Sequence, residues 1–232
     1  MNVTFENYRT LNFDTIEIQE EWNMPAERER RMHSIHAYPA KFPAFITTKA
    51  IHKAEENNIS VKTVADIFCG CGTVAFETVR SGKHFWGCDI NPVATLIAET
   101  KSNVYQDEQL EDFFDRIIAA YKTCSVDKSN HIYSNERIQY WFDEEHIDNL
   151  LKLRSAIYLV VDDELYRKFF LCAFSNILKS CSRWLTKSIK PQIDSKKQPK
   201  DVLSSYIYQV NMMRRANMEN INEKYGEADI KR

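Results

Sequence analysis

The segment Asp66-Ile-Phe-Cys-Gly-Cys-Gly-Thr73, followed by Gly87-Cys-Asp-Ile-Asn-Pro92, decides the fold of this 232-residue chain. A short buried strand is predicted in and just before the first segment by four apolar residues, Val61, Val64, Ile67 and Phe68. Gly70 and Gly72 then allow a tight turn and bring the backbone close to a ligand, because glycine has no side chain to obstruct it.

A helix and a second strand are predicted after this turn. Thr73 is placed to cap a short helix that ends near Ser81 and Gly82. The next strand is predicted from Phe85, Trp86 and Ile90. Asp89 falls at its carboxyl end, 23 residues after Asp66. Because open α/β sheets bind ligands at the carboxyl ends of their strands, an acid at this distance suits the hydroxyls of a ribose.

The glycine pattern alone is weak, since it is G-x-G and Ala75 occupies the place of a third glycine. A strand-to-helix turn that binds nothing is the simpler explanation of such a pattern. The preceding strand, the acid at Asp89 and the Asn91-Pro92 pair favour a site for an adenosine-containing cofactor instead.

Three motifs carry a resemblance to a known family. The Asp66–Thr73 run resembles the D-x-F-x-G-x-G-T motif of S-adenosylmethionine-dependent DNA amino-methyltransferases, and Gly87–Pro92 resembles the G-x-D-I-N-P that follows it. Upstream, His36-Ala-Tyr-Pro-Ala-Lys-Phe-Pro43 is similar to the H-x-Y-P-A-K-F-P box that members with a permuted motif order place before the cofactor strand. The resemblance is strong over about residues 33–103. It implies a Rossmann-like α/β sheet and S-adenosylmethionine as cofactor.

The resemblance also implies roles for particular residues. The residues expected around the methionine portion of the cofactor are Asp66, Phe68, Cys69, Gly70, Gly72 and Thr73. Asp89 is expected to accept hydrogen bonds from the ribose, with Ile90 and Asn91 beside it. The residues expected to close the pocket from the other side are Tyr38, Pro39, Ala40, Lys41 and Phe42. Cys69 and Cys71 replace residues that are small or prolyl in relatives, but their backbones still serve.

The six cysteines do not suggest a metal site. Cys69, Cys71 and Cys88 lack the paired C-x2-C spacing of structural zinc sites, and the other three are scattered. We therefore expect buried free thiols in a reducing cytoplasm, and no metal. No apolar stretch reaches the ~18 residues of a membrane span, and no signal peptide is recognisable at the N-terminus.

A basic segment is the one candidate for contact with double-stranded DNA. The net charge is only −2, so affinity for nucleic acid has to come from a local patch. Residues 179–200 contain seven basic residues and one acid, and Pro191 and Pro199 keep much of the stretch out of helix. The predicted phosphate contacts are Lys187, Lys190, Lys196, Lys197 and Lys200. A solvated loop is the alternative.

The rest of the chain is predicted to be mainly helical. Helices are expected at about 91–101, 108–121, 141–157 and 163–178, and Asp201 is expected to cap a last long one. Residues 104–210 then form a large helical insertion after the second strand. The chain divides into a cofactor-binding part, residues 1–103, and a helical part with the basic loop, residues 104–232.

One motif of the family is absent from these 232 residues. DNA amino-methyltransferases hold the target amino group with [DNS]-P-P-[YFW], and no two prolines are adjacent here. No histidine pairs with a nucleophile or acid in a recognisable motif, so we identify no catalytic residue. The chain is therefore expected to be the cofactor-binding half of a split or truncated enzyme whose partner subunit carries the catalytic motif. The alternative is a catalytically silent module that docks on or regulates a restriction-modification enzyme. Whether cytosine N4 or adenine N6 is the target stays open.

Overall fold

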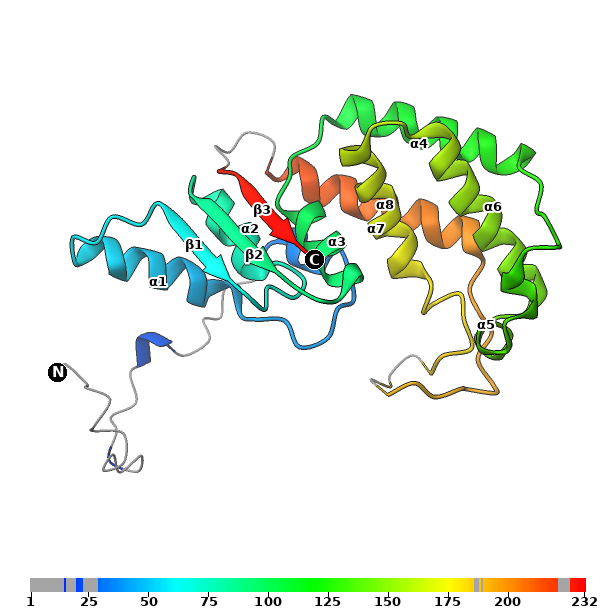
Figure 1. The fold of residues 1–232 in the computed structure, drawn as a ribbon, viewed down its shortest axis with the longest axis horizontal. Helices are drawn as coiled ribbons and strands as arrows, with labels where there is room; N and C mark the ends of the chain where they lie inside the picture. The colour runs from blue at the N-terminus through cyan, green and yellow to red at the C-terminus, as the bar shows by residue number, and fades with distance from the viewer. Residues whose placement is uncertain (1–14, 16–19, 23–28, 186–187, 189, 221–225) are drawn as a thin grey trace.

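A computed structural model describes residues 15, 20–22, 29–185, 188, 190–220 and 226–232. One end of the molecule consists of a small parallel sheet and the helices beside it, and the other end is a bundle of helices (Figure 1). The predicted α/β class is confirmed, with a partial Rossmann-like sheet and a large helical insertion.

The sheet has three parallel strands in the order β1-β2-β3, which are Thr63–Asp66, His84–Cys88 and Ala228–Lys231. Ala65 lies opposite Trp86, and Trp86 lies opposite Asp229. The third strand was not predicted, because four residues with alternating polarity are too short to stand out. The chain thus leaves the sheet after β2, builds the helical insertion, and returns to pair with β2.

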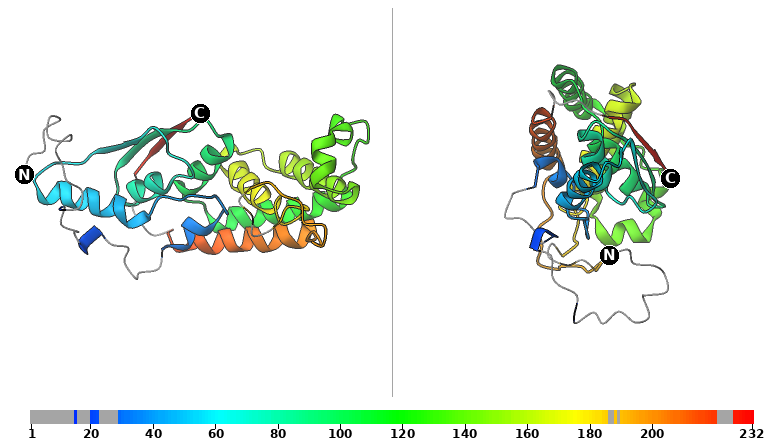
Figure 2. Two further views of the ribbon diagram at one scale, coloured as in Figure 1. Left: turned by 90° about the horizontal axis from the view of Figure 1, so that it is seen from below. Right: turned by 90° about the vertical axis from the view of Figure 1, so that its left-hand side faces the viewer.

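Helices cover one face of this sheet. The helices α1, α2 and α3 are Ala44–Glu56, Thr73–Arg80 and Pro92–Lys101, and Figure 2 shows them on the same side of the strands. Phe85 of β2 is buried against Ala75 and Val79 of α2. Trp86 points to the other face and is 38% exposed. Among the described residues, β1 pairs only with β2, so its other edge is free.

Both predicted strands end earlier than the sequence pattern indicates. The prediction of a buried first strand is wrong, because β1 is a half-exposed edge strand and Ile67 and Phe68 lie beyond it. Asp66 Oδ1 accepts a hydrogen bond from the Phe68 N–H at 3.0 Å, which turns the chain out of the sheet. Ile90 also lies beyond its strand and is 92% exposed.

The glycine turn between β1 and α2 differs from the prediction in its cap. Gly72, not Thr73, occupies the N-cap of α2, with a left-handed φ of 75°. A Cβ atom on Gly72 would lie 2.5 Å from the Cβ of Ala98 in α3. Gly72 is therefore required by helix packing, and Thr73 is the buried first residue of the helix.

The insertion contains four long helices and one short one. They are α4 (Asp107–Thr123), α5 (Glu136–Trp141), α6 (Glu144–Val160), α7 (Glu164–Ile177) and α8 (Val202–Met218). Short 3-10 turns are Glu20–Trp22, Arg31–Ser34 and His131–Ser134. The predicted helices are confirmed, but the one expected at 141–157 begins later: α5 ends at Trp141, and Asp143 caps α6 by accepting a hydrogen bond from the His146 N–H.

The main hydrophobic core lies between the long helices of the insertion. Its fully buried side chains include Leu110, Ile117, Leu153, Phe169, Phe170, Tyr206 and Met213. The Asn217 side chain joins this core to the sheet end, since it donates to Tyr105 O at 2.7 Å and accepts from Tyr105 N at 3.0 Å. None of the helices that the structure describes is both long and apolar enough to cross a lipid bilayer.

Candidate cofactor and DNA site

The His36–Pro43 box is an irregular segment that the helical insertion holds in place. The Ala37 N–H donates to Asn176 Oδ1 of α7 at 2.9 Å. His36 Nε2 lies 3.2 Å from Ser175 Oγ on the same helix. Ala40 has a left-handed φ of 53°, which bends the box between its two prolines. A segment without regular structure is thus fixed by side chains that lie about 140 residues later in the sequence.

A second layer of amides supports these contacts. Asn176 Nδ2 donates to Gln209 Oε1 of α8 at 2.7 Å, and Gln209 Nε2 donates to Ile35 O at 2.7 Å. Gln209 is 4% exposed. The oxygen and the nitrogen of both side-chain amides are hydrogen-bonded, so the network favours one position of the box relative to α7 and α8.

The glycine turn is tied to the end of β2 by one carboxylate. Asp89 Oδ2 accepts from the Gly70 N–H at 3.0 Å, and its Oδ1 accepts from the Asn91 N–H at 2.8 Å. Gly70 has a φ of 50°, and only Phe68 O, at 3.9 Å, lies near the position of a Cβ atom. Asp89 therefore holds the backbone of the turn at the Gly70 N–H, while the space next to the Gly70 Cα atom is open.

The box and the glycine turn enclose one cavity of about 490 Å³. Nine of the predicted cofactor residues line it: Tyr38, Ala40, Lys41, Phe42, Asp66, Phe68, Cys69, Gly70 and Thr73. Pro39, Gly72, Asp89, Ile90 and Asn91 do not line it. Pro43, Cys71 and Val74 line it without having been predicted; Pro43 and Cys71 belong to the two motifs, and Val74 directly follows the second.

The cavity wall suits the parts of S-adenosylmethionine. Its volume falls in the range of ligand pockets, ~300–1,000 Å³. Lys41 and Asp66 place one cation and one anion on the wall, as the carboxylate and the cationic groups of the methionine portion require. Phe68 is 82% exposed at the mouth and offers an apolar surface to an aromatic ring. Asp89 does not line the cavity, but it is bonded to Gly70 at the cavity wall, and each of its oxygens keeps a lone pair for a hydroxyl donor.

Basic groups gather behind the cavity. Lys41 Nζ donates to His33 O at 2.5 Å, which leaves two further hydrogens for a ligand. Lys101 is fully buried, with Nζ 3.5 Å from Cys71 Sγ. Its burial lowers the pKa of Lys101. Burial, followed by the charges of Lys101 and Lys41, lowers the pKa of His36 to about 4. His36 is therefore a neutral hydrogen-bonding group at pH 7.

The thiols beside the cavity are unreactive. Cys69 and Cys71 are both buried and free. Burial and the nearby Asp89 and Asp66 carboxylates raise the pKa of the Cys69 thiol to about 12. Cys69 therefore stays protonated and contributes its backbone to the turn, because only a thiolate is a strong nucleophile.

The basic segment lies on the insertion, at the ends of α7 and α8. Lys190, Lys196 and Lys200 are exposed. Lys197 Nζ instead donates to Lys179 O and Trp184 O, each at 2.8 Å, so it holds the loop together. Lys187 lies outside the described residues.

Comparison with known proteins agrees with this geometry. The sequence model of the DNA methylase family matches residues 4–100. The type II methyltransferase M.MvaI of Kocuria varians is 26% identical over 156 residues, which are 65% of this chain and 34% of the relative. The chain thus spans about a third of the length of that relative. No solved structure matches significantly. The resemblance in the motifs is confirmed: residues 4–100, which include the box and the glycine turn, match the DNA methylase family.

Proposed function

We propose that this chain binds S-adenosylmethionine in the cavity between the box and the glycine turn, as the cofactor-binding part of a DNA amino-methyltransferase. The observation that carries the proposal is the meeting of two motifs, 23 residues apart in the sequence, around one cavity at the carboxyl end of β1. Asp89 accepts hydrogen bonds from the ribose in this proposal, and the walls bearing Lys41 and Asp66 hold the methionine portion.

The cofactor supplies an activated methyl group, and the acceptor is the exocyclic amine of a cytosine or adenine. Such an amine is conjugated with its ring and is a poor nucleophile, so it needs acceptors that localise its lone pair. The base also has to leave the double helix to reach the methyl group. The residues that hold the amine lie outside these 232, which have no adjacent prolines. We propose that a further polypeptide segment or a partner subunit supplies them.

The sheet offers a place for that segment. β1 has a free edge among the described residues, and the face around Trp86 is not covered by the described helices. Ile67, Phe68 and Ile90 are exposed at the carboxyl ends of the strands. Free edges and apolar surfaces of this kind are normally covered in stable proteins. The type II methyltransferase relative supports a role in a restriction-modification system.

A pair of glycine substitutions tests cofactor binding. Gly70 and Gly82 both have left-handed φ angles, 50° and 71°, and both have room for a Cβ atom. Gly70→Ala and Gly82→Ala should each destabilise the fold by about 1 kcal/mol, the cost of that conformation in an L-residue. Only Gly70→Ala places its methyl group in the cavity, so it should weaken S-adenosylmethionine binding about tenfold or more in calorimetry.

The pair separates binding from folding. Equal affinity for the cofactor in Gly70→Ala and Gly82→Ala would place the ligand elsewhere. As a second variant, Asp89→Ala should weaken binding by about 1–3 kcal/mol, because ribose hydroxyls lose their acceptor. Its thermal unfolding has to be measured in parallel, since Asp89 also holds the Gly70 N–H.

A further inference from the structure

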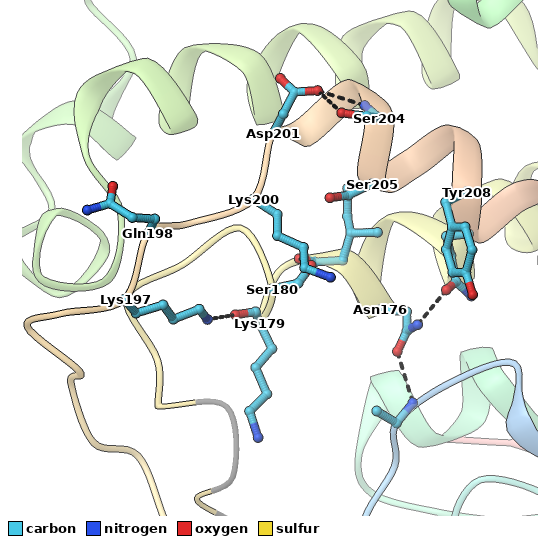
Figure 3. A pocket seen from close by; sticks show the side chains of 13 residues that line it. Asn176, Lys179, Ser180, Lys197, Gln198, Lys200, Asp201, Ser204, Ser205 and Tyr208 are labelled. Carbon is cyan, nitrogen blue, oxygen red and sulfur yellow. Dashed lines mark hydrogen bonds between the residues drawn. The ribbon is translucent and has the colours of Figure 1, made fainter.

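A second cavity, of about 760 Å³, lies between the C-terminal end of α7, residues 197–201 and the first turns of α8. Figure 3 shows the side chains that line it, with Lys179, Lys197 and Lys200 on the loop side and Tyr208 on α8. Ala37 closes one edge of this cavity, and its neighbour Tyr38 lines the cofactor cavity. Two adjacent residues of the box therefore line the two cavities, one each.

The charges of this cavity are predominantly positive. Asp201 is its only acidic lining residue, and its carboxylate caps α8 by accepting from the Ser204 N–H at 2.8 Å. The hydrogen bonds with Ser204 lower the pKa of Asp201. Two of the lysines are already engaged: Lys197 bonds backbone carbonyls, and Lys179 Nζ donates to Ser188 O at 3.0 Å.

Lys200 is presented differently. Its backbone is held on both sides, because its N–H donates to Ser180 O at 3.1 Å and its carbonyl lies 3.2 Å from His146 Nε2. Its ammonium group has no partner among the described residues, and the side chain reaches along the cavity toward Ser180 (Figure 3). A fixed backbone with an unpaired cation is suited to binding an anion from outside.

Tyr208 supplies an aromatic surface on the wall of the same cavity. It is 74% exposed, one helical turn after Ser204 on the same face of α8. An exposed aromatic ring and a free lysine on one cavity wall are the combination with which proteins bind nucleotides of an unpaired strand, by stacking on a base and pairing with a phosphate.

We propose that this cavity receives a DNA nucleotide that neighbours the methylated nucleotide on the same strand. Its base would stack on Tyr208, and its phosphate would pair with Lys200. The inference rests on the proposed function, because the adjacent cavity is the one assigned to the cofactor. It differs from a general basic surface in two ways. It assigns Lys197 to the loop and not to DNA, and it requires a ring at position 208.

The test is binding of a labelled single-stranded DNA oligonucleotide of mixed sequence to the 232-residue chain, followed by fluorescence anisotropy at several salt concentrations. Tyr208→Ala should weaken binding about five- to twentyfold, as expected for the loss of one stacked base, and Tyr208→Phe should restore it. Lys200→Gln should reduce the salt slope by about 0.7, the value for one phosphate contact on a single strand. Lys62→Ala, which removes an exposed lysine before β1, is the matched control and should change neither.

Further arms identify the ligand. An oligonucleotide carrying 5-iodouracil should crosslink to Tyr208 on irradiation, as mapped by mass spectrometry. Inorganic phosphate at millimolar concentration should not compete, whereas competition would indicate a site for a free anion and contradict the proposal. Tighter binding of the matched RNA, wild-type affinity in Tyr208→Ala, or no oligonucleotide binding by the wild-type chain would each overturn it.

The two proposals fail separately. Calorimetry with S-adenosylmethionine on Tyr208→Ala and Lys200→Gln should give the wild-type affinity, because neither residue lines the cofactor cavity. Loss of oligonucleotide binding in these variants supports the second cavity even if Gly70→Ala leaves cofactor binding unchanged. Unchanged oligonucleotide binding in these variants would refute the proposed nucleotide site and leave the proposed cofactor site untouched.

Discussion

At the scale of single residues, the candidate site depends on how burial changes ordinary side chains. His36 is kept neutral because it lies among Lys101, Lys41 and the packed box. Cys69 is kept as a thiol by burial and two carboxylates. Lys197 resembles a DNA-binding lysine in the sequence, but it is partly buried and donates to two carbonyls. Residue type and spacing suggested the chemistry, and local environment determined which groups carry it.

The neutral state of His36 predicts a pH dependence of stability. The pKa of His36 is about 4 in the folded chain, against an ordinary value of 6.5. Between pH 6.5 and pH 4, His36 is therefore protonated in the unfolded chain and neutral in the folded chain. The free energy of unfolding therefore falls as the pH is lowered through this window. Between pH 7.5 and pH 5.0, His36→Gln should lose about 1–2 kcal/mol less than the wild type in urea unfolding. If the free energy of unfolding falls equally with pH in both proteins, His36 has its ordinary pKa in the folded chain and the prediction is wrong.

At the scale of elements, two helices of the insertion position a segment of the cofactor site. Asn176 of α7 and Gln209 of α8 form a chain of hydrogen bonds to Ala37 and Ile35. The buried pair of His33 and Glu77, 2.7 Å apart, ties the same segment to α2. The box is therefore held between the sheet and the insertion, and a change in either should alter the cofactor cavity.

We predict that Asn176→Ala weakens cofactor binding although Asn176 does not touch that cavity. The substitution leaves the Ala37 N–H and the buried Gln209 Oε1 without partners, which costs about 1–3 kcal/mol and loosens the box. S-adenosylmethionine affinity in calorimetry should fall about threefold or more. Asn211→Ala, on α8, is the matched control and should bind as the wild type. Wild-type affinity in Asn176→Ala would mean that the box holds its position without α7.

At the scale of the whole molecule, the chain has one well-packed part and one incomplete part. The insertion buries a continuous core between α4, α6, α7 and α8. The sheet has three strands, two free edges, at β1 and at β3, and an open face among the described residues. Ala37 of the box lines the larger cavity together with residues of the insertion, and Tyr38 lines the smaller cavity at the glycine turn. The proposed cofactor site and the proposed nucleotide site thus share the box.

The last prediction is that these 232 residues alone transfer no methyl group to DNA. The acceptor amine needs hydrogen-bond acceptors that hold it in line with the methyl group, and the chain has no adjacent prolines of the family motif. Labelled S-adenosylmethionine should therefore leave no label in any DNA offered. Addition of a polypeptide carrying the P-P-Y segment should give a stable complex and restore transfer. Robust methylation by the chain alone would refute the proposal of a separate catalytic segment, whereas no rescue and no cofactor binding would favour a silent module.

The sequence by itself determined the cofactor motifs, the class of fold and most helix positions. These follow from local signals: glycines at a turn, an acid after a strand, and apolar residues at helical spacing. Nine of the fourteen predicted cofactor residues line one cavity: five belong to the Asp66–Thr73 motif and four to the box, whereas Asp89, Ile90 and Asn91 after β2 do not line it.

Only the tertiary structure decided the ends of the strands, the reason for Gly72 and the roles of the lysines. Gly72 is needed because Ala98 of another helix packs against it, and β3 pairs with β2 although the helical insertion separates them in the sequence. The cavity beside Tyr208 likewise joins Ala37 to residues 176–209. Such contacts depend on packing between distant segments, and no local pattern of residues records which distant segment will lie alongside.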